Sequence, residues 1–437
     1  MTSDDPATLT QWDKSHAWHP FTQMQDWTAP AHQPLFITRG EGVWLYDIEG
    51  KRYLDGNSTI WTNLHGHRHP RLDAALAGQA AKIAHVSALG FANEPATRLA
   101  RALVQLWPEG TLQRVFFSDD GSTAIECAVK MALQYHQLTG HPERSSFAAF
   151  ENAYHGDTMA AATLGGISTF TERFRRFGLS TRHFPDMAAL EQMPRESSAT
   201  LAAVIIEPLI QGSAGMRTWP AGMLGALRHW CNERGVLLIC DEVLTGFGRT
   251  GRMFACHHEG VVPDFLCLAK GLTGGYLPLA ATLTRESIYE AFLGRFEELK
   301  TFFYGHSYTG NPLACAVALA SLEVFQEEDT LARLQPKMAL MGSLLTDLKA
   351  RHPQHLGAVR QCGFIAGLDV LADAPAGRPF PWQVQTGARI CLAARDAGLL
   401  TRPIRDTLIL MPPLCTSEAE LRHAMQALSH GIAAVCR

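Results

Sequence analysis

The stretch VLLICDEVLTGFGRTG, residues 236–251, and the stretch FLCLAKGLTGG, residues 265–275, decide the fold class of this chain. Each begins with an apolar run that lacks alternating polar side chains, a pattern typical of a strand buried on both faces of a parallel sheet. Each run is followed by one charged side chain, Asp241 in the first and Lys270 in the second. Open α/β sheets bind ligands at the carboxyl ends of their strands. We therefore expect an acid and an amine at the rim of one sheet.

An acid and an amine in this position suit pyridoxal 5'-phosphate. The lysine forms a Schiff base with this cofactor, and the acid pairs with its pyridinium nitrogen. Apolar surroundings would lower the pKa of the Lys270 amine and make the free base available. Most lysines at strand ends point to solvent, so the prediction depends on Lys270 and Asp241 meeting in one site.

The composition is that of a globular protein of more than one domain. Of the 437 residues, 46% are hydrophobic and 18% are charged, enough apolar material for two cores. The net charge of −4 gives no indication of nucleic acid or an anionic membrane as a partner. The N-terminus, MTSDDPATLTQWD, is acidic and polar, unlike a signal peptide. Ten cysteines without a CxxC pair fit a cytoplasmic protein without a thiolate metal site.

Strand-like runs and helical stretches alternate through the middle of the chain. The runs cover residues 114–120, 147–150, 202–208, 236–242, 265–269 and 279–284. This rhythm predicts an α/β domain over residues 61–325 with a mostly parallel sheet. Residues 326–437 read as a smaller α+β domain. Residues 1–60 read as an extended lead-in followed by a β-hairpin around Glu49–Gly50, which would complete the smaller domain.

A phosphate site is expected where the run 114–120 gives way to a helix. Gly121 and Ser122 stand at this helix start, and free backbone N–H groups together with the helix dipole attract a phosphate there. An isolated Gly–Ser pair is more often only a helix cap. The later Asp241 and Lys270 of the same sheet favour the phosphate interpretation.

Two further polar segments are candidate binding residues. ENAYHGDT, residues 151–158, follows the run 147–150, so Tyr154 could stack on a flat ring and Asp157 could orient a polar substrate group. GHSYTGNP, residues 305–312, offers Gly305 and the pair His306–Ser307 as donors to a phosphate. Taken alone, the first segment is also a plain polar turn and the second a plain helix start.

Two other motifs point to chemistry that we do not expect. GFGRTG, residues 246–251, has the spacing of a dinucleotide fingerprint, but no long helix follows it and the next strand supplies Lys270 instead of an acid. HGHRHP, residues 65–70, resembles a cluster of metal ligands, but no carboxylates or cysteines accompany it. We therefore predict no metal site.

The segments IIEP, DEVLTGFGRTG, LAKGLTGG and HSYTGNP, between residues 205 and 312, together resemble the class III aminotransferases of the fold-type I pyridoxal-phosphate enzymes. The resemblance implies an aspartate-aminotransferase-like α/β fold with a mostly parallel central sheet and a smaller α+β domain. It also implies a homodimer with active sites at the subunit interface.

The resemblance assigns the cofactor contacts position by position. It implies that Lys270 binds the cofactor and shuttles a proton, and that Asp241 keeps the pyridine nitrogen protonated. Gly121–Ser122 would bind the phosphate, joined by His306–Ser307 from the neighbouring subunit.

Segments near both ends resemble, more narrowly, the branch of this class that aminates 8-amino-7-oxononanoate in biotin synthesis with S-adenosylmethionine as amino donor. These segments are WHPFTQM (18–24), DGNSTIWTNLHGH (55–67), SALGFANEPATRLA (87–100), KMALQYHQ (130–137) and TRPIRDTLILMPP (401–413). The resemblance implies that Tyr154, Asp157 and Gly305 line the substrate site and that Arg402 pairs with a substrate carboxylate, which matches its planar fork.

Two positions depart from the better-known members of this branch. Phe21 replaces a tyrosine, and Ile60–Trp61 replaces a pair of tryptophans, both at the border of the substrate pocket. These changes leave lysine open as an alternative donor. Three other interpretations also stay open: a class III aminotransferase for ω-amino acids or diamines, a nicotinamide-dependent oxidoreductase, and a binding protein without catalysis.

Overall fold

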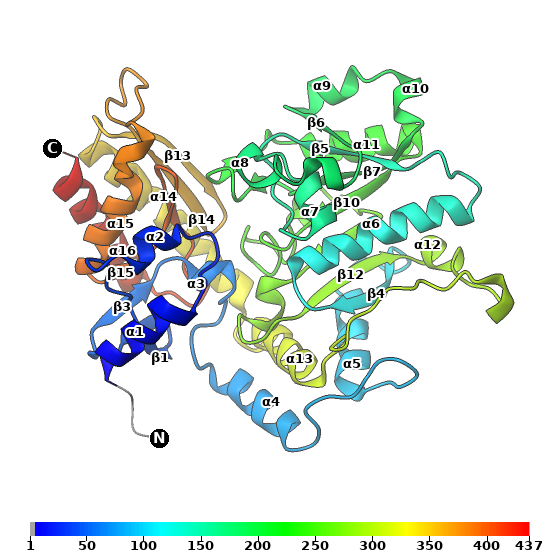
Figure 1. Ribbon diagram of the computed structural model, residues 1–437, viewed down its shortest axis with the longest axis horizontal. Coiled ribbons are helices and arrows are strands. Elements are labelled where there is room, and N and C mark those ends of the chain that lie inside the picture. The colour runs from blue at the N-terminus through cyan, green and yellow to red at the C-terminus, as the bar shows by residue number, and fades with distance from the viewer. Residues whose placement is uncertain (1–4, 437) are drawn as a thin grey trace.

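The chain folds into two lobes that lie side by side (Figure 1). The computed structural model describes residues 5–436. The larger lobe is built on a seven-stranded sheet, whose strands follow one another in space as β4 (Leu112–Ser118), β12 (Ala280–Arg285), β11 (Phe265–Leu268), β10 (Leu237–Asp241), β7 (Leu201–Ile206), β5 (Ser146–Phe150) and β6 (Thr181–Phe184).

The direction of the strands confirms the predicted, mostly parallel α/β sheet. Strands β11, β10, β7, β5 and β6 are parallel to one another, and β12 runs antiparallel to both β11 and β4. Strand β6 was not predicted. Its four residues, TRHF, are half-buried or exposed, so no apolar run marks it in the sequence.

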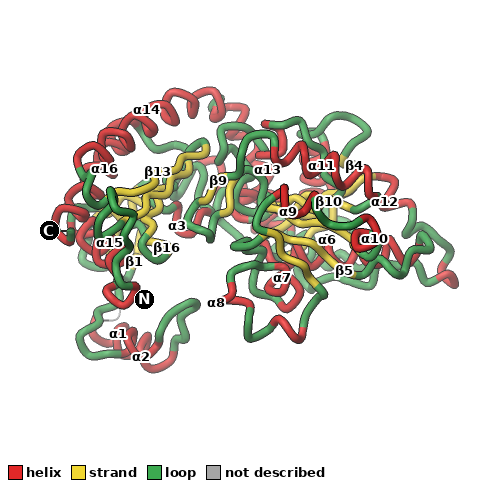
Figure 2. Tube along the Cα trace, turned by 90° about the horizontal axis from the view of Figure 1, so that it is seen from above, coloured by secondary structure: helices red, strands yellow, loops and turns green. Residues whose placement is uncertain are grey.

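Helices cover both faces of this sheet (Figure 2). On one face lie α6 (Gly121–Leu138) and α7 (Met159–Leu164), and on the other lie α5 (Glu94–Val104), α11 (Met223–Arg234) and α13 (Pro312–Glu327). In β10, Ile239 joins the core of the first face, while Leu238 and Cys240 join the core of the second. Burial on both faces explains why the predicted strands are apolar without alternation.

The smaller lobe combines both ends of the chain. Its main sheet has the order β13 (Leu356–Cys362), β14 (Ile365–Val370), β17 (Thr407–Leu410) and β16 (Pro403–Ile404), beside α14 (Thr330–Arg351), α15 (Thr386–Asp396) and α16 (Glu418–Val435). The predicted hairpin forms between β2 (Trp44–Asp47) and β3 (Arg52–Asp55), flanked by β1 (Ile37–Glu41). Strand β3 pairs in parallel with β15 (Leu399–Leu400), so residues near both termini share one sheet. The limits of the domains at residues 60 and 325 stay a prediction.

Short elements fill the connections. They are α3 (Ser58–Trp61), α4 (Pro70–Ala80), α8 (Ser168–Thr171), α9 (Met187–Glu191), α10 (Arg195–Ser198), α12 (Glu286–Glu290), β8 (Ile210–Gln211) and β9 (Arg217–Thr218). Within residues 5–436, no helix has the length and apolar character needed to cross a bilayer.

The predicted extended lead-in is wrong, because the N-terminal segment forms two helices, α1 (Pro6–His16) and α2 (Met24–Thr28). Asp13 links them, since its carboxylate contacts His19 Nε2 at 2.9 Å and accepts a hydrogen bond from Trp27 Nε1 at 2.7 Å. Neither helix has a buried residue, so the sequence carries no apolar periodicity that would reveal them.

The GFGRTG segment does not form a dinucleotide site. Residues 246–251 form successive turns, and the next helical element is a single 3₁₀ turn, Ala255–His258, where a dinucleotide fingerprint would open a long α-helix. The three histidines of residues 65–69 bind three different partners, which are Ser321, Asp55 and Glu328. The described residues contain no group of three side chains able to hold a metal ion.

The contact between Gly363 and the GFGRTG segment gives a test of how the lobes pack. Gly363 has a φ of +60°, and a Cβ there would lie 2.3 Å from the Thr250 carbonyl carbon. We expect Gly363→Ala to lower the free energy of unfolding by about 3 kcal/mol, through steric clash and backbone strain. Urea denaturation monitored by circular dichroism measures the change.

Gly377→Ala is the matched control. Gly377 has a φ of +65°, but a Cβ there would meet nothing within 4 Å. It should cost only the left-handed strain, about 1 kcal/mol. Equal losses in both variants would contradict the proposed close contact.

Candidate active site

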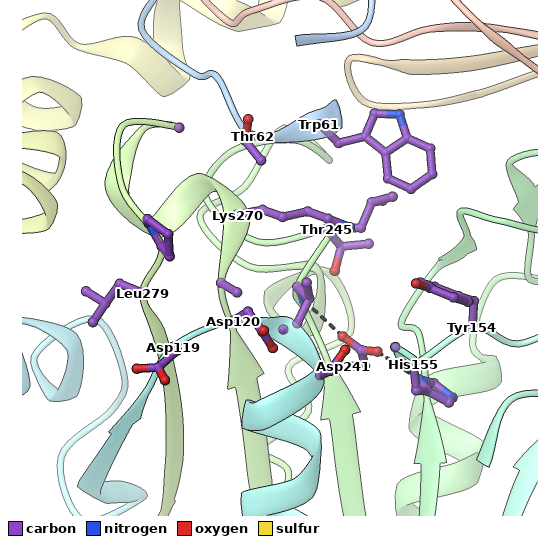
Figure 3. A pocket seen from close by; sticks show the side chains of 18 of the residues that line it. Trp61, Thr62, Asp119, Asp120, Tyr154, His155, Asp241, Thr245, Lys270 and Leu279 are labelled. Carbon is purple, nitrogen blue, oxygen red and sulfur yellow. Dashed lines mark hydrogen bonds and ion pairs between the residues drawn. The ribbon is translucent and has the colours of Figure 1, made fainter. Parts of the chain in front are cut away.

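Six of the predicted residues line one cavity of about 440 Å³ at the carboxyl ends of the strands (Figure 3). They are Trp61, Gly121, Ser122, Tyr154, Asp241 and Lys270. Strands β4, β5 and β11 each end two to four residues before one of these side chains or pairs, and β10 ends at Asp241 itself. The parallel arrangement of the larger lobe therefore gathers residues from distant parts of the sequence at one rim.

Asp241 is fixed at the floor of the cavity. Its Oδ2 lies 2.7 Å from Nδ1 of His155, and its Oδ1 accepts a hydrogen bond from the Val243 N–H at 3.1 Å. The His155 side chain is fully buried, and its Nε2 has no partner among residues 5–436. His155 was missed by the sequence analysis, although it stands next to Tyr154 at the end of the same strand.

Lys270 enters the cavity from the end of β11. Its backbone is left-handed, with a φ of +43°, a conformation that non-glycine residues rarely adopt and that often marks a functional position. Burial lowers the pKa of the Lys270 amine, and the carboxylates of Asp241 and Glu207 oppose this shift. The amine lies 4.8 Å from the centre of the Trp61 ring. The site thus favours a more nucleophilic amine than a surface lysine offers.

Glu207 is a second residue that the sequence analysis did not single out. It belongs to the IIEP motif after β7 and is buried. Its carboxylate accepts hydrogen bonds from the N–H groups of Tyr154 at 3.1 Å and Gly212 at 2.9 Å. Burial raises the pKa of Glu207 to about 7. Glu207 therefore ties together two loops that border the cavity.

The start of α6 presents free N–H groups to the cavity. Asp120 caps the helix by accepting from the Thr123 N–H at 2.9 Å. The N–H groups of Gly121 and Ser122 have no partner within the helix, as is usual in a first turn. Ser122 Oγ accepts a hydrogen bond from the Asp157 N–H at 3.2 Å. These donors form an arrangement that suits a phosphate.

Tyr154 lines the cavity, and Asp157 lies beside it outside the lining. The Tyr154 hydroxyl donates to Asp157 Oδ2 at 2.5 Å. Burial and this carboxylate raise the pKa of Tyr154, so the hydroxyl stays protonated and able to donate. The ring meets Phe170 edge-on, and Phe170 in turn meets Phe21 edge-on. The N-terminal segment therefore reaches the neighbourhood of the cavity through a row of aromatic rings.

The other predicted residues lie outside the cavity of the single chain. Phe21 is 66% exposed, and Ile60 is also exposed. Arg402 is exposed and makes no ion pair with any residue that the structure describes. In the segment that also holds Gly305 and Ser307, His306 contacts Asp119 Oδ2 at 2.8 Å, and Asp119 itself lines the cavity.

The residues of the cavity fit pyridoxal phosphate. The cofactor needs an amine of lowered pKa for its aldehyde, a carboxylate for its ring nitrogen and donors for its phosphate. Lys270, the fixed carboxylate of Asp241 and the free N–H groups at Gly121 and Ser122 supply all three around one space.

Comparisons with known proteins agree with this geometry. The model of the family "Aminotransferase class-III" matches residues 27–432. A relative from Geobacter sulfurreducens, named adenosylmethionine-8-amino-7-oxononanoate aminotransferase, is 43% identical over 99% of each chain. The crystal structure of the enzyme of that name from Methanocaldococcus jannaschii matches with a TM-score of 0.95 and 41% identity, over 99% of this chain and 100% of that one.

A more distant structure shares the same fold. An (S)-enantioselective ω-transaminase from Thermomicrobium roseum matches with a TM-score of 0.92 and 33% identity over all of both chains. The match to the family model over residues 27–432 and the nearly full-length matches to relatives and solved structures leave one assignment. The chain belongs to the class III aminotransferases, and it is a pyridoxal-phosphate-dependent transaminase of fold type I.

Proposed function

We propose that this enzyme transfers the amino group of S-adenosylmethionine to 8-amino-7-oxononanoate and forms 7,8-diaminononanoate, a step of biotin synthesis. The relatives that carry this activity in their names reach 45% identity and match nearly the whole chain. The observation that carries the proposal is the cavity in which the Lys270 amine, with its lowered pKa, lies among residues that would hold the ring and the phosphate of the cofactor.

We assign four contacts to the cofactor and one positioning role to residues of a single chain. Lys270 would bind the aldehyde carbon, Asp241 would pair with the ring nitrogen, and Gly121–Ser122 would hold the phosphate. His155 would act on Asp241, because its hydrogen bond fixes the carboxylate in one orientation. When bound, the cofactor supplies a reactive carbonyl carbon and a ring that accepts electrons from the substrate carbon.

The remaining chemistry falls to side chains of the chain. Lys270 Nζ would move the proton between the reacting substrate carbon and the cofactor. The Tyr154 hydroxyl, kept protonated beside Asp157, would donate to a polar group of the substrate. Trp61 would keep water from the amine, since its buried ring lies over Lys270.

Arg402 would bind the carboxylate of the acceptor. Its guanidinium is exposed and free of ion pairs within residues 5–436, so it is available for a bidentate pair. Gly305 would lie near the same substrate, from the segment that precedes α13.

The identity of the donor depends on two positions at the rim. Phe21 offers no hydroxyl, and Ile60 offers no flat ring. Without these two contacts, either S-adenosylmethionine or lysine could serve as the amino donor. An ω-amine is the further candidate, because the Thermomicrobium roseum structure is named as an ω-transaminase. The higher identity to the biotin-pathway relatives favours S-adenosylmethionine.

We further propose a homodimer in the cytoplasm. Large apolar side chains are exposed in two loops, with Leu89 and Phe91 in one and Phe296 and Phe303 in the other. An interface would bury such side chains. There His306–Ser307 of one subunit would reach the phosphate of the other. All ten cysteines are free, as in a reducing compartment.

Replacement of Lys270 tests the enzyme assignment. We expect Lys270→Ala to lower the rate of the first half-reaction by about 10³-fold or more, because proton transfer and covalent binding are both lost. The absorbance of the cofactor in a stopped-flow instrument measures this rate. Lys337→Ala is the control, since Lys337 is a half-buried lysine that bonds to the Leu414 carbonyl away from the cavity.

The donor is tested by mixing the purified yellow enzyme separately with S-adenosylmethionine and with lysine. We expect S-adenosylmethionine to bleach the absorbance of the lysine-bound cofactor and lysine to leave it unchanged. If lysine alone bleaches the absorbance, the amino donor is lysine and not S-adenosylmethionine. Bleaching by a simple ω-amine alone would remove the biotin assignment.

The acceptor site is tested at Arg402. We expect Arg402→Ala to lower kcat/KM for 8-amino-7-oxononanoate by about 30-fold or more, the loss of a charge-assisted bond to a carboxylate. Arg405→Ala is the control, because Arg405 is exposed three residues further along. Equal effects of the two changes would show that general positive charge, and not a specific pair, attracts the acceptor.

A further inference from the structure

The turn that carries Trp61 has an unusual backbone. Residues 57–62 connect β3 of the smaller lobe to the larger lobe, and three of them have a positive φ without being glycine: Ser58, Thr59 and Trp61, with φ values of 49°, 61° and 64°. Such conformations are unfavourable for L-residues and persist only when the surroundings impose them. The turn must therefore be held by contacts outside its own backbone.

We propose that Asp55 is a positioning residue that holds this turn and so places the Trp61 indole over the Lys270 amine. The inference rests on the proposed function, because Lys270 matters only if it is the catalytic amine. Asp55 is the last residue of β3 and is 2% exposed. Both of its oxygens lie 2.8 Å from the Thr59 nitrogen, which donates its hydrogen to the carboxylate.

A chain of hydrogen bonds requires Asp55 to be an acceptor only. The Gly66 N–H donates to Asn63 Oδ1 at 2.8 Å, so the Asn63 amide nitrogen faces His67 Nδ1, at 3.1 Å, and donates to it. His67 then carries its hydrogen on Nε2 and donates it to Asp55 Oδ2 at 3.0 Å. Donors thus approach Asp55 from two sides. An asparagine at this position would place an N–H group against one of them.

The other end of the turn is fixed at Trp61. Its Nε1 donates to Asn57 Oδ1 at 2.9 Å, and the Ser58 hydroxyl donates to the Met411 carbonyl at 2.7 Å. The ring packs in a small apolar cluster with Leu244 and Met411. Figure 3 shows the indole beside the end of the Lys270 side chain. A shift of the turn would therefore move the ring relative to the amine.

The same strand end is also linked to the segment that carries Arg402, the residue proposed to bind the acceptor. Asp55 is paired with Leu400 in the β3–β15 ladder, and the Gly56 N–H donates to the Leu400 carbonyl at 2.8 Å. Arg402 follows two residues after Leu400. Trp61 and Arg402, which we propose to act near the donor and the acceptor, thus follow two strands that are paired at Asp55 and Leu400.

A double-mutant cycle tests whether Asp55 acts through Trp61. The variants are Asp55→Asn, Trp61→Phe and their combination, all as holoenzymes. We expect each single change to slow the first half-reaction with S-adenosylmethionine about tenfold at saturating donor, with a smaller change in the apparent Kd. The combination should be no slower than Trp61→Phe alone, because the second change has nothing left to displace. Additive losses would overturn the proposal.

Tryptophan fluorescence supplies a readout that does not depend on turnover. The bound cofactor quenches a nearby indole, so the emission lost on cofactor binding should differ between the wild type and Trp61→Phe. We expect this difference to shrink at least twofold in the Asp55→Asn background. An unchanged difference would overturn the proposal. This measurement decides the role of Asp55 even if the wild type reacts with neither proposed donor, a result that would refute the proposed function alone.

Asp47→Asn is the matched control. Asp47 is 7% exposed and accepts hydrogen bonds from the N–H groups of Glu49 and Lys51 and from the Tyr53 hydroxyl, in the β2–β3 turn. It should lower the melting temperature without changing the half-reaction or the quenching. If Asp55→Asn does not fold, His67→Ala takes its place, because it removes one donor and leaves the carboxylate. A response of either variant that matches Asp47→Asn would overturn the proposal.

Discussion

The carboxylate of Asp241 lies at the end of β10, and the rest of the site depends on its fixed position there. A charged oxygen pair in a protein interior is costly unless hydrogen bonds satisfy it. The His155 ring and the Val243 N–H supply these bonds from two different strand ends. The fixed carboxylate then acts on the Lys270 amine across the cavity. Burial lowers the pKa of Lys270, and the carboxylate of Asp241 raises it.

The groups that act on the pKa of Lys270 and the ring that covers its amine come from different parts of the chain. The larger lobe supplies the charged groups, because its parallel strands end together. The smaller lobe supplies the two strands that precede Trp61 and Arg402, which are β3 and β15. These strands pair with each other in parallel. The Lys270 amine stays desolvated only if a side chain keeps water away from it. The Trp61 ring, in the turn after β3, lies over the amine. The polar floor and the aromatic cover thus come from separate units of the chain.

The sequence predicts the residues that follow long buried strands better than it predicts their partners. Asp241 and Lys270 stand out because apolar runs isolate them. His155 and Glu207 follow strands as well, but each resembles an ordinary turn or strand end, and only the fold shows that they meet Asp241 and Tyr154. Strand β6 and helices α1 and α2 escape prediction because their residues are half-buried or exposed. Phe21, His306 and Arg402 lie away from the cavity of one chain, and no local pattern indicates what they face.

The GFGRTG segment shows that the same spacing of glycines can have different structural roles in different folds. In a dinucleotide site, the glycines bring a helix start to a pyrophosphate. Here they allow the chain to turn beneath the smaller lobe, and Arg249 becomes fully buried. Its guanidinium donates to the carbonyls of Asn63 and Pro412, each at 2.8 Å. Burial lowers the pKa of Arg249 to about 9, and the charge of Asp55 opposes that shift. Because Asn63 is the residue that orients His67 toward Asp55, the motif that suggests a nucleotide site instead supports the turn that carries Trp61.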